Sequence, residues 1–73
     1  MYKSKLRYLM ADKKIDSIKN LAELTEVSRP PLDKLYKEKD LETLSLDVIA
    51  RICKYFNCRI EDLIEYVPDN TQD

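Results

Sequence analysis

Apolar residues recur every three or four positions along most of the chain, which is the spacing of one face of an α-helix. The pattern is clearest over about residues 46–56, which Ser45 precedes as a suitable N-cap. The apolar positions of this segment are Ile49, Ile52, Cys53 and Phe56. Residues 41–46 come nearest to the alternation of a half-buried strand, but they lie between two helical segments. The pattern therefore predicts an all-α fold.

Four more helices are expected from the same spacing. Their approximate ranges are residues 3–13, 18–25, 29–37 and 60–66. Ser17 stands where the N-cap of the second helix should be, and Glu61 and Asp62 suit the N-terminal end of the fifth. The side chains expected to face the core from these helices are Leu6, Leu9, Met10, Leu21, Ala22, Leu24, Leu32, Leu35, Tyr36, Leu63, Ile64 and Tyr66. The five helices should form one compact bundle over residues 1–67, followed by a flexible acidic tail at residues 68–73.

Composition limits the chemistry that the chain can perform. Its 73 residues suffice for one domain and include neither glycine nor histidine. Without glycine, phosphate-binding loops that need close backbone approach are excluded. Without histidine there is no Ser-His-Asp or Cys-His triad and no imidazole metal ligand. The sequence therefore predicts a protein that is not an enzyme, with no catalytic residue, metal ligand, cofactor or small-molecule ligand to name.

Two cysteines, Cys53 and Cys58, are too few for the disulfide framework of a small secreted domain or for a four-ligand zinc site. Cys53 falls on the apolar face of its helix and is expected in the core, whereas Cys58 is either a packed or a reactive thiol. The sequence has no signal-peptide pattern and no apolar run of membrane-spanning length. These features predict a soluble cytoplasmic protein that does not enter a membrane.

Charge is divided unevenly between the two halves of the chain. The net charge is −1 overall. Residues 1–40 contain ten Lys and Arg against seven Asp and Glu, whereas residues 41–73 contain three against seven, giving +3 and −4. A basic first half is expected if one face of the protein binds nucleic acid, although ordinary surface charge explains the division equally well.

The most informative segment is residues 17–36. It contains two short helical stretches separated by about three residues, with the small residue Ala22 midway along the first, where the second must approach closely. Val27 lies in the turn and can fill the gap between the helices. Leu32 and Leu35 are one turn apart on the inner side of the second stretch. This spacing is typical of a helix-turn-helix.

On these residues the chain resembles the Xre family of bacterial and phage regulators, whose helix-turn-helix is similar to those of lambda repressor and Cro. The resemblance rests on Leu21-Ala22, Val27-Ser28-Arg29, Leu32, Leu35 and the trailing Asp62-Leu63-Ile64-Glu65-Tyr66. It covers about residues 4–67 and implies a five-helix, lambda-repressor-like DNA-binding domain. It further implies a sequence-specific transcriptional regulator, such as a Cro-type repressor of a phage or mobile element, or the antitoxin of a toxin–antitoxin pair.

Three positions depart from the pattern of this family. Glu26 occupies the turn position usually given to glycine, and if this position needs a positive φ, the left-handed backbone costs a glutamate roughly 1 kcal/mol. Ile18 stands where a glutamine often holds a phosphate. Pro30 and Pro31 occupy the first turn of the second helix of the motif, so Ser28 should lack the two amide donors that a side-chain cap accepts.

The resemblance implies which side chains meet DNA, because the helix at residues 29–37 would enter the major groove. The residues expected to contact bases are Arg29, Pro30, Pro31, Asp33 and Lys34. Arg29 is the best candidate for a specific contact, because its guanidinium can bond O6 and N7 of one guanine together. Asp33 lies four residues from both Arg29 and Lys37, a spacing at which side chains on one helix meet. Three roles are open to it: to orient Arg29, to accept a hydrogen bond from the amino group of a cytosine, or to form a surface ion pair. The residues expected to bind phosphates are Ser17, Lys19, Ser28, Lys37 and Lys39.

The second half of the chain should cover the helix-turn-helix, and apolar side chains left exposed there would mark a dimer surface. The candidates are Tyr55, Ile60, Ile64 and Tyr66, unless all four belong to the core. The expected partners are double-stranded DNA and a second copy of the chain, because one monomer offers few base contacts and a two-fold dimer reads two half-sites. A second interpretation stays open. It is a protein-interaction module that keeps the helix-turn-helix scaffold and binds another regulator, with weak or no binding to DNA.

Overall fold

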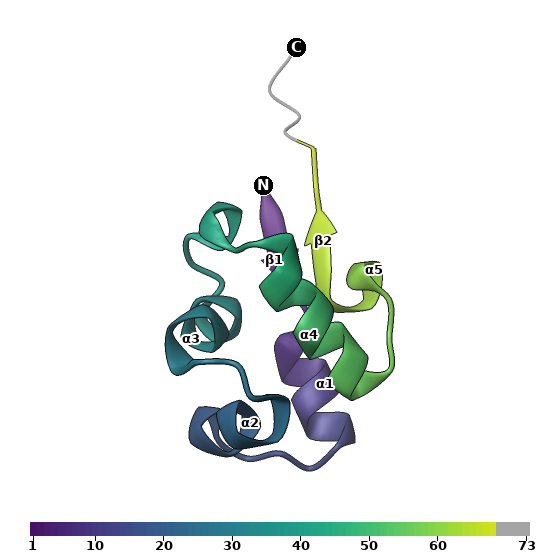
Figure 1. Ribbon diagram of the computed structural model, residues 1–73. Coiled ribbons are helices and arrows are strands. Elements are labelled where there is room, and N and C mark those ends of the chain that lie inside the picture. The colour runs from purple at the N-terminus through teal and green to yellow at the C-terminus, as the bar shows by residue number, and fades with distance from the viewer. Residues whose placement is uncertain (69–73) are drawn as a thin grey trace.

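The computed structural model of the chain describes residues 1–68. The order of elements in this range is β1 (Tyr2–Ser4), α1 (Leu6–Asp12), α2 (Ile18–Thr25), α3 (Arg29–Lys37), the 3₁₀ helix η1 (Leu41–Thr43), α4 (Leu46–Phe56), α5 (Ile60–Leu63) and β2 (Ile64–Tyr66). The helices surround one core, and the two strands lie side by side at one end of the molecule (Figure 1). Of the expected tail, residues 69–73 lie outside the described part of the chain.

The ranges predicted for α2, α3 and α4 are confirmed, because local signals fix their ends. Ser17 and Ser45 cap α2 and α4 by accepting hydrogen bonds from the backbone N–H groups of Asn20 and Val48 at 3.1 and 3.2 Å. The residues that follow these three helices in a left-handed conformation are Glu26, Glu38 and Asn57. None of the helices within residues 1–68 combines the length and the apolar character needed to cross a membrane.

Two strands correct the expectation of an all-α fold. They pair antiparallel, with Tyr2 opposite Tyr66, Lys3 opposite Glu65 and Ser4 opposite Ile64. Backbone hydrogen bonds of 2.7 Å extend the ladder at both ends, from the N–H of Val67 to the carbonyl of Met1 and from the N–H of Lys5 to the carbonyl of Leu63. This pairing removes residues 3–4 from the first expected helix and shortens the fifth to four residues.

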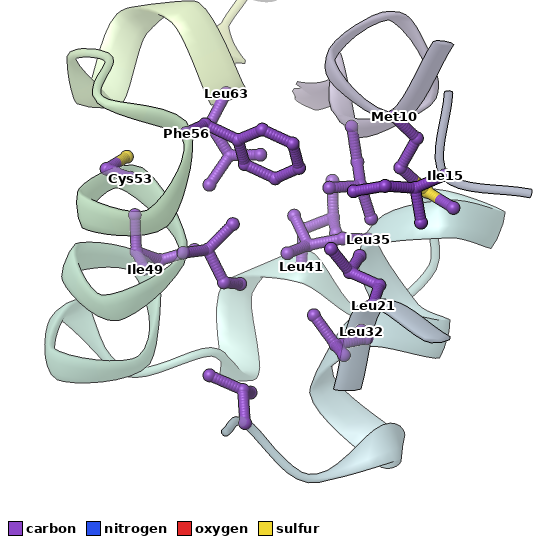
Figure 2. Packing of buried hydrophobic residues seen from close by; sticks show 13 residues of the cluster. Met10, Ile15, Leu21, Leu32, Leu35, Leu41, Ile49, Cys53, Phe56 and Leu63 are labelled. Atoms are coloured by element: carbon purple, nitrogen blue, oxygen red, sulfur yellow. The ribbon is translucent and has the colours of Figure 1, made fainter. Parts of the chain in front are cut away.

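Thirteen apolar side chains form the core, and every helix of the described chain contributes to it. They are Leu6, Met10, Ile15, Leu21, Val27, Leu32, Leu35, Leu41, Ile49, Ile52, Cys53, Phe56 and Leu63. Figure 2 shows side chains of the helix-turn-helix meeting those of α4 across the interior. Among residues 1–68 no polar or charged side chain is buried. The core is therefore entirely apolar in this range, and functional side chains must be sought at the surface.

Three residues expected in the core lie at the surface instead. Leu24, Tyr36 and Tyr66 are 44%, 37% and 62% exposed. On α2 the buried side runs through Leu21, so Leu24 falls to one side of it. Tyr66 belongs to a strand rather than a helix, and its ring packs against that of Tyr2 with 5.6 Å between the ring centres. Tyr36 is covered on one side by an arginine of α1, as described below.

Candidate nucleic-acid interface

The turn between α2 and α3 holds the two helices in a fixed relation. Glu26 adopts a left-handed conformation, with φ 59° and ψ 29°, and its N–H bonds to the carbonyl of Ala22 at 2.9 Å. The hydroxyl of Thr25 donates to the carbonyl of Leu21 at 2.8 Å and accepts from the N–H of Val27 at 3.3 Å. Val27 then enters the core, where it is 5% exposed. The left-handed Glu26 and the buried Val27 confirm what the sequence predicts for this turn.

The inner face of α3 seats it on the core. Leu32 and Leu35 are fully buried, and Figure 2 shows both among the side chains that fill the space between the helices. The helix ends at Glu38, which is left-handed with φ 55°. The N–H of Lys39 then bonds to the carbonyl of Lys34 at 3.0 Å, as in a Schellman motif. The α3 helix is thus fixed on one side and closed at its C-terminal end.

The N-terminal turn of α3 carries three of the residues expected to contact bases. Arg29 and Pro30 are exposed, and Pro31 is half-buried. Ser28 is the N-cap and makes no side-chain cap bond, as the two prolines predict. Because Pro30 and Pro31 lack N–H groups, this helix start offers fewer backbone donors to an anion than an ordinary N-terminus does. The polar groups that this turn offers are therefore mainly those of its side chains, and Arg29 is the positively charged residue among them.

Lys34, another expected base contact, is half-buried and already has a partner. Its Nζ donates to the hydroxyl of Thr43 at 2.7 Å, and that hydroxyl donates to the carbonyl of Asp40 at 2.7 Å. The two bonds connect α3 to η1. The ammonium of Lys34 has three N–H donors, and the bond to Thr43 uses one of them.

Asp33, the acidic residue of the expected reading face, is half-buried. The ion pairs within residues 1–68 are Lys5–Glu65 at 3.8 Å and Arg51–Asp47 at 3.7 Å. Asp33 is therefore not paired with Arg29 or Lys37 in this part of the chain. Its carboxylate stays available as an acceptor.

The five residues expected to bind phosphates are all exposed. They are Ser17, Lys19, Ser28, Lys37 and Lys39. Ser17 and Lys19 lie at the N-terminal end of α2, and the other three lie at the two ends of α3. The Ser17 oxygen accepts from the N–H of Asn20, so its hydroxyl hydrogen is still free to donate to a phosphate.

Arg7 of α1 lies beside α3 and was missed in the sequence. Its Nε donates to the carbonyl of Tyr36 at 3.2 Å, and its guanidinium carbon lies 4.5 Å from the centre of the Tyr36 ring. Nearby, a carboxylate oxygen of Glu38 accepts from the N–H of Ser4 at 3.2 Å. Residues so far apart along the chain share no periodic pattern, so no sequence signal could pair them. The fold thereby adds a guanidinium next to the C-terminal end of α3.

An apolar groove of about 310 Å³ lies between η1, the N-terminal end of α4 and the sheet. Four of the eight large apolar residues exposed within residues 1–68 line it, namely Tyr2, Leu46, Ile60 and Tyr66. Of the expected dimer residues, Ile60, Ile64 and Tyr66 line this groove. Tyr55 does not line it; it lies beside Leu24 and Arg51 at a second hollow of the surface, and its ring packs edge-on against Phe56 with 5.2 Å between ring centres. The groove is the largest collection of exposed apolar side chains in the described chain.

The two cysteines pack at the C-terminal end of α4. Cys53 is buried and Cys58 is half-buried, and the N–H of Cys58 bonds to the carbonyl of Cys53 at 3.0 Å. Burial raises the pKa of the Cys53 thiol to about 11, with smaller contributions from Cys58 and Asp62. A thiol with this pKa is protonated near neutral pH and is a poor nucleophile. The expectation that Cys53 is a core residue is thus confirmed.

Comparison with known proteins agrees with this geometry. The family model of the Cro/C1-type HTH DNA-binding domain matches residues 5–69, which is nearly the whole chain. No curated protein matches the chain. The family match includes α2, α3 and the turn at Glu26, and it agrees with the resemblance to Xre regulators. This chain belongs to the Cro/C1-type family of helix-turn-helix DNA-binding domains.

Proposed function

We propose that the protein is a sequence-specific transcriptional regulator that reads the major groove of DNA with α3. The observation that carries this proposal is the two-sidedness of α3: Leu32 and Leu35 are fully buried, whereas Arg29 and Pro30 at its first turn are exposed. A helix held in this way can enter the major groove without disturbing the core. Its exposed first turn is the part that meets base edges in helix-turn-helix proteins.

Base recognition would centre on Arg29. A guanidinium that bonds O6 and N7 of a guanine discriminates against other bases by roughly 1–3 kcal/mol. Pro30 and Pro31 would contact thymine methyl groups, since their rings are apolar and lack a donor. Asp33 would accept from a cytosine amino group or orient Arg29, and Lys34 would use the two donors that its bond to Thr43 leaves free.

Affinity would come mainly from phosphates. Ser17 and Lys19 at the start of α2 would contact one stretch of the DNA backbone. Ser28, Lys37 and Lys39 at the ends of α3 would contact the backbone on either side of the groove. Such contacts orient the protein and make binding strongly dependent on salt, because each neutralised phosphate releases counterions.

A second copy of the chain would complete the binding unit. One α3 offers only a few base contacts, whereas two related by a two-fold axis read half-sites about one helical turn apart, roughly 34 Å. The apolar groove is the surface proposed for this contact. Leu46 on its edge is 76% exposed, and full burial of such a side chain contributes roughly 1.5–3 kcal/mol. A dimer that occupies its operator would act as a cytoplasmic repressor of Cro type, for a phage or mobile element, by excluding other proteins from the site.

Selection of duplexes from a random pool, followed by measured affinities, tests the DNA-binding proposal. An enriched palindromic site is expected, with affinity that falls steeply as salt increases. Arg29→Ala should remove the preference for that site, while Lys37→Ala should weaken binding to all sequences alike. Failure to enrich any sequence would refute the proposal. Salt-insensitive binding to a protein instead would favour the interaction-module interpretation.

Sedimentation of the protein alone and with the selected duplex tests the dimer. Leu46→Glu should leave the fold intact, since the side chain is exposed, and should reduce dimer formation and cooperative binding. Tyr8→Glu on α1 is the matched control, because Tyr8 is 75% exposed and lies outside the groove. If both variants assemble as the unmodified protein does, the groove is not the dimer surface.

A further inference from the structure

Two contacts from the start of the chain hold the C-terminal end of α3. Arg7 of α1 donates from Nε to the carbonyl of Tyr36 at 3.2 Å. Its guanidinium stacks over the Tyr36 ring, with 4.5 Å between the guanidinium carbon and the ring centre. This carbonyl is one of the last four of the helix, which have no partner within it. The positive charge also interacts favourably with the C-terminal end of the helix dipole. Beyond the helix, the carboxylate of Glu38 accepts from the N–H of Ser4 in β1 at 3.2 Å.

These contacts lie outside the core. Arg7 and Glu38 are exposed, and Tyr36 is 37% exposed, so none of the three belongs to the thirteen buried residues. Leu32 and Leu35 are the buried residues of α3 and pack it against the core. The outer contacts add restraints at its C-terminal end that do not depend on this buried pair.

We infer that Arg7 is a positioning residue for DNA recognition, which acts through Tyr36 to fix the angle at which α3 enters the major groove. The inference rests on the proposed function and adds a determinant of specificity that touches no base. Tyr36 lies seven positions after Arg29, a rise of roughly 10 Å along the helix. A tilt of about 10° over that length displaces one end by roughly 2 Å, which is more than a hydrogen bond tolerates. A less restrained C-terminal end of α3 would therefore displace Arg29 at the N-terminal end of the same helix.

Arg7→Lys is the decisive variant, because it keeps the positive charge and removes the Nε donor and the planar group that stacks. We expect its affinity for the selected duplex to fall about tenfold, the size of one lost base contact. Affinity for a scrambled duplex and the salt dependence should be unchanged. Tyr36→Phe is the matched control, since it keeps both the ring and the backbone carbonyl, and it should bind as the unmodified protein does. An equal loss on both duplexes would mean that Arg7 contacts a phosphate, and no loss at all would also overturn the inference.

Amide hydrogen exchange of the free protein tests the same inference without DNA. Arg7→Lys should accelerate exchange at the C-terminal end of α3 about tenfold or more, and should leave α4 unchanged. If no duplex is enriched in the selection, the proposed function fails while this measurement still reports on α3. Unchanged exchange in α3 would overturn the inference. So would equal acceleration in α3 and α4, because Arg7 would then serve general stability.

Discussion

Replacement of Glu26 by glycine should stabilise this protein. Glu26 closes α2 with φ 59° and ψ 29°, a left-handed conformation that costs a residue with a Cβ roughly 1–2 kcal/mol. Glycine avoids this cost, but its greater freedom in the unfolded chain offsets roughly 0.5–1 kcal/mol of the gain. The difference predicts a free energy of unfolding higher by about 0.5–1 kcal/mol. For a domain of this size that corresponds to a rise in Tm of about 2–8 °C.

The substitution should remove little else. The side chain of Glu26 is exposed and belongs to neither of the ion pairs formed within residues 1–68. Its backbone N–H keeps the 2.9 Å bond to the carbonyl of Ala22. Glu26→Ala serves as a second comparison, because it removes the carboxylate but keeps the Cβ. It should therefore show none of the gain.

Glu23→Gly is the matched control for this prediction. Glu23 is exposed like Glu26 but lies within α2, where glycine is less favourable than ordinary residues by up to about 1 kcal/mol. Thermal and urea denaturation followed by circular dichroism should therefore show shifts of opposite sign for the same chemical change. If both glycine variants lose stability to the same extent, the left-handed geometry assigned to this turn is wrong.

Three other predictions follow from single contacts. Ser17→Ala should lower the free energy of unfolding by about 1 kcal/mol, because it removes the side-chain cap of α2. Ser28→Ala should change this free energy little, since Ser28 makes no cap bond, and urea denaturation of both variants compares the two effects. Leu32→Ala should cost about 2–5 kcal/mol, because the side chain is fully buried, and calorimetry will show a folded state largely lost at 37 °C. The pKa of Cys53, raised from 9.0 to about 11, favours the protonated thiol in the folded state. That contribution to stability is full below pH 9 and should be lost as the pH rises toward about 11, and Cys53→Ala should lack this part of the loss in parallel denaturation curves.

The helix-turn-helix could be predicted from the sequence because its boundaries depend on neighbours within one or two turns. Ser17 accepts a hydrogen bond from a residue three positions later, and Pro30 and Pro31 act on the N-cap directly before their helix. The buried pair Leu32 and Leu35 follows from helical spacing alone. Signals of this kind are local, so the structure preserves them.

The sheet and the surroundings of α3 could not be predicted in the same way. Tyr2 pairs with Tyr66, and each strand is only three residues long, which is too short for alternation to be distinguished from a helix end. The bond of Lys34 to Thr43 and the stacking of Arg7 on Tyr36 both depend on how helices pack after they form. Sequence reasoning therefore identified Arg29 and Pro30 as exposed residues of α3 but missed the contacts that restrain the rest of the helix.

Absence of glycine links the stability of this chain to its proposed function. Within residues 1–68, five residues with a Cβ adopt positive φ, and three of them, Glu26, Glu38 and Asp40, lie within three residues of an end of α3. Each of these left-handed residues costs roughly 1 kcal/mol, and together they lower the free energy of unfolding by a large fraction of the total that a small domain possesses. Glycine would remove this cost, but it would also widen the range of φ and ψ angles that each turn can adopt. Under the proposed function α3 presents Arg29 to one base pair, and it would benefit from turns with few accessible backbone angles near both of its ends. The strain at these positions and the contact of Arg7 with Tyr36 would then act in the same direction.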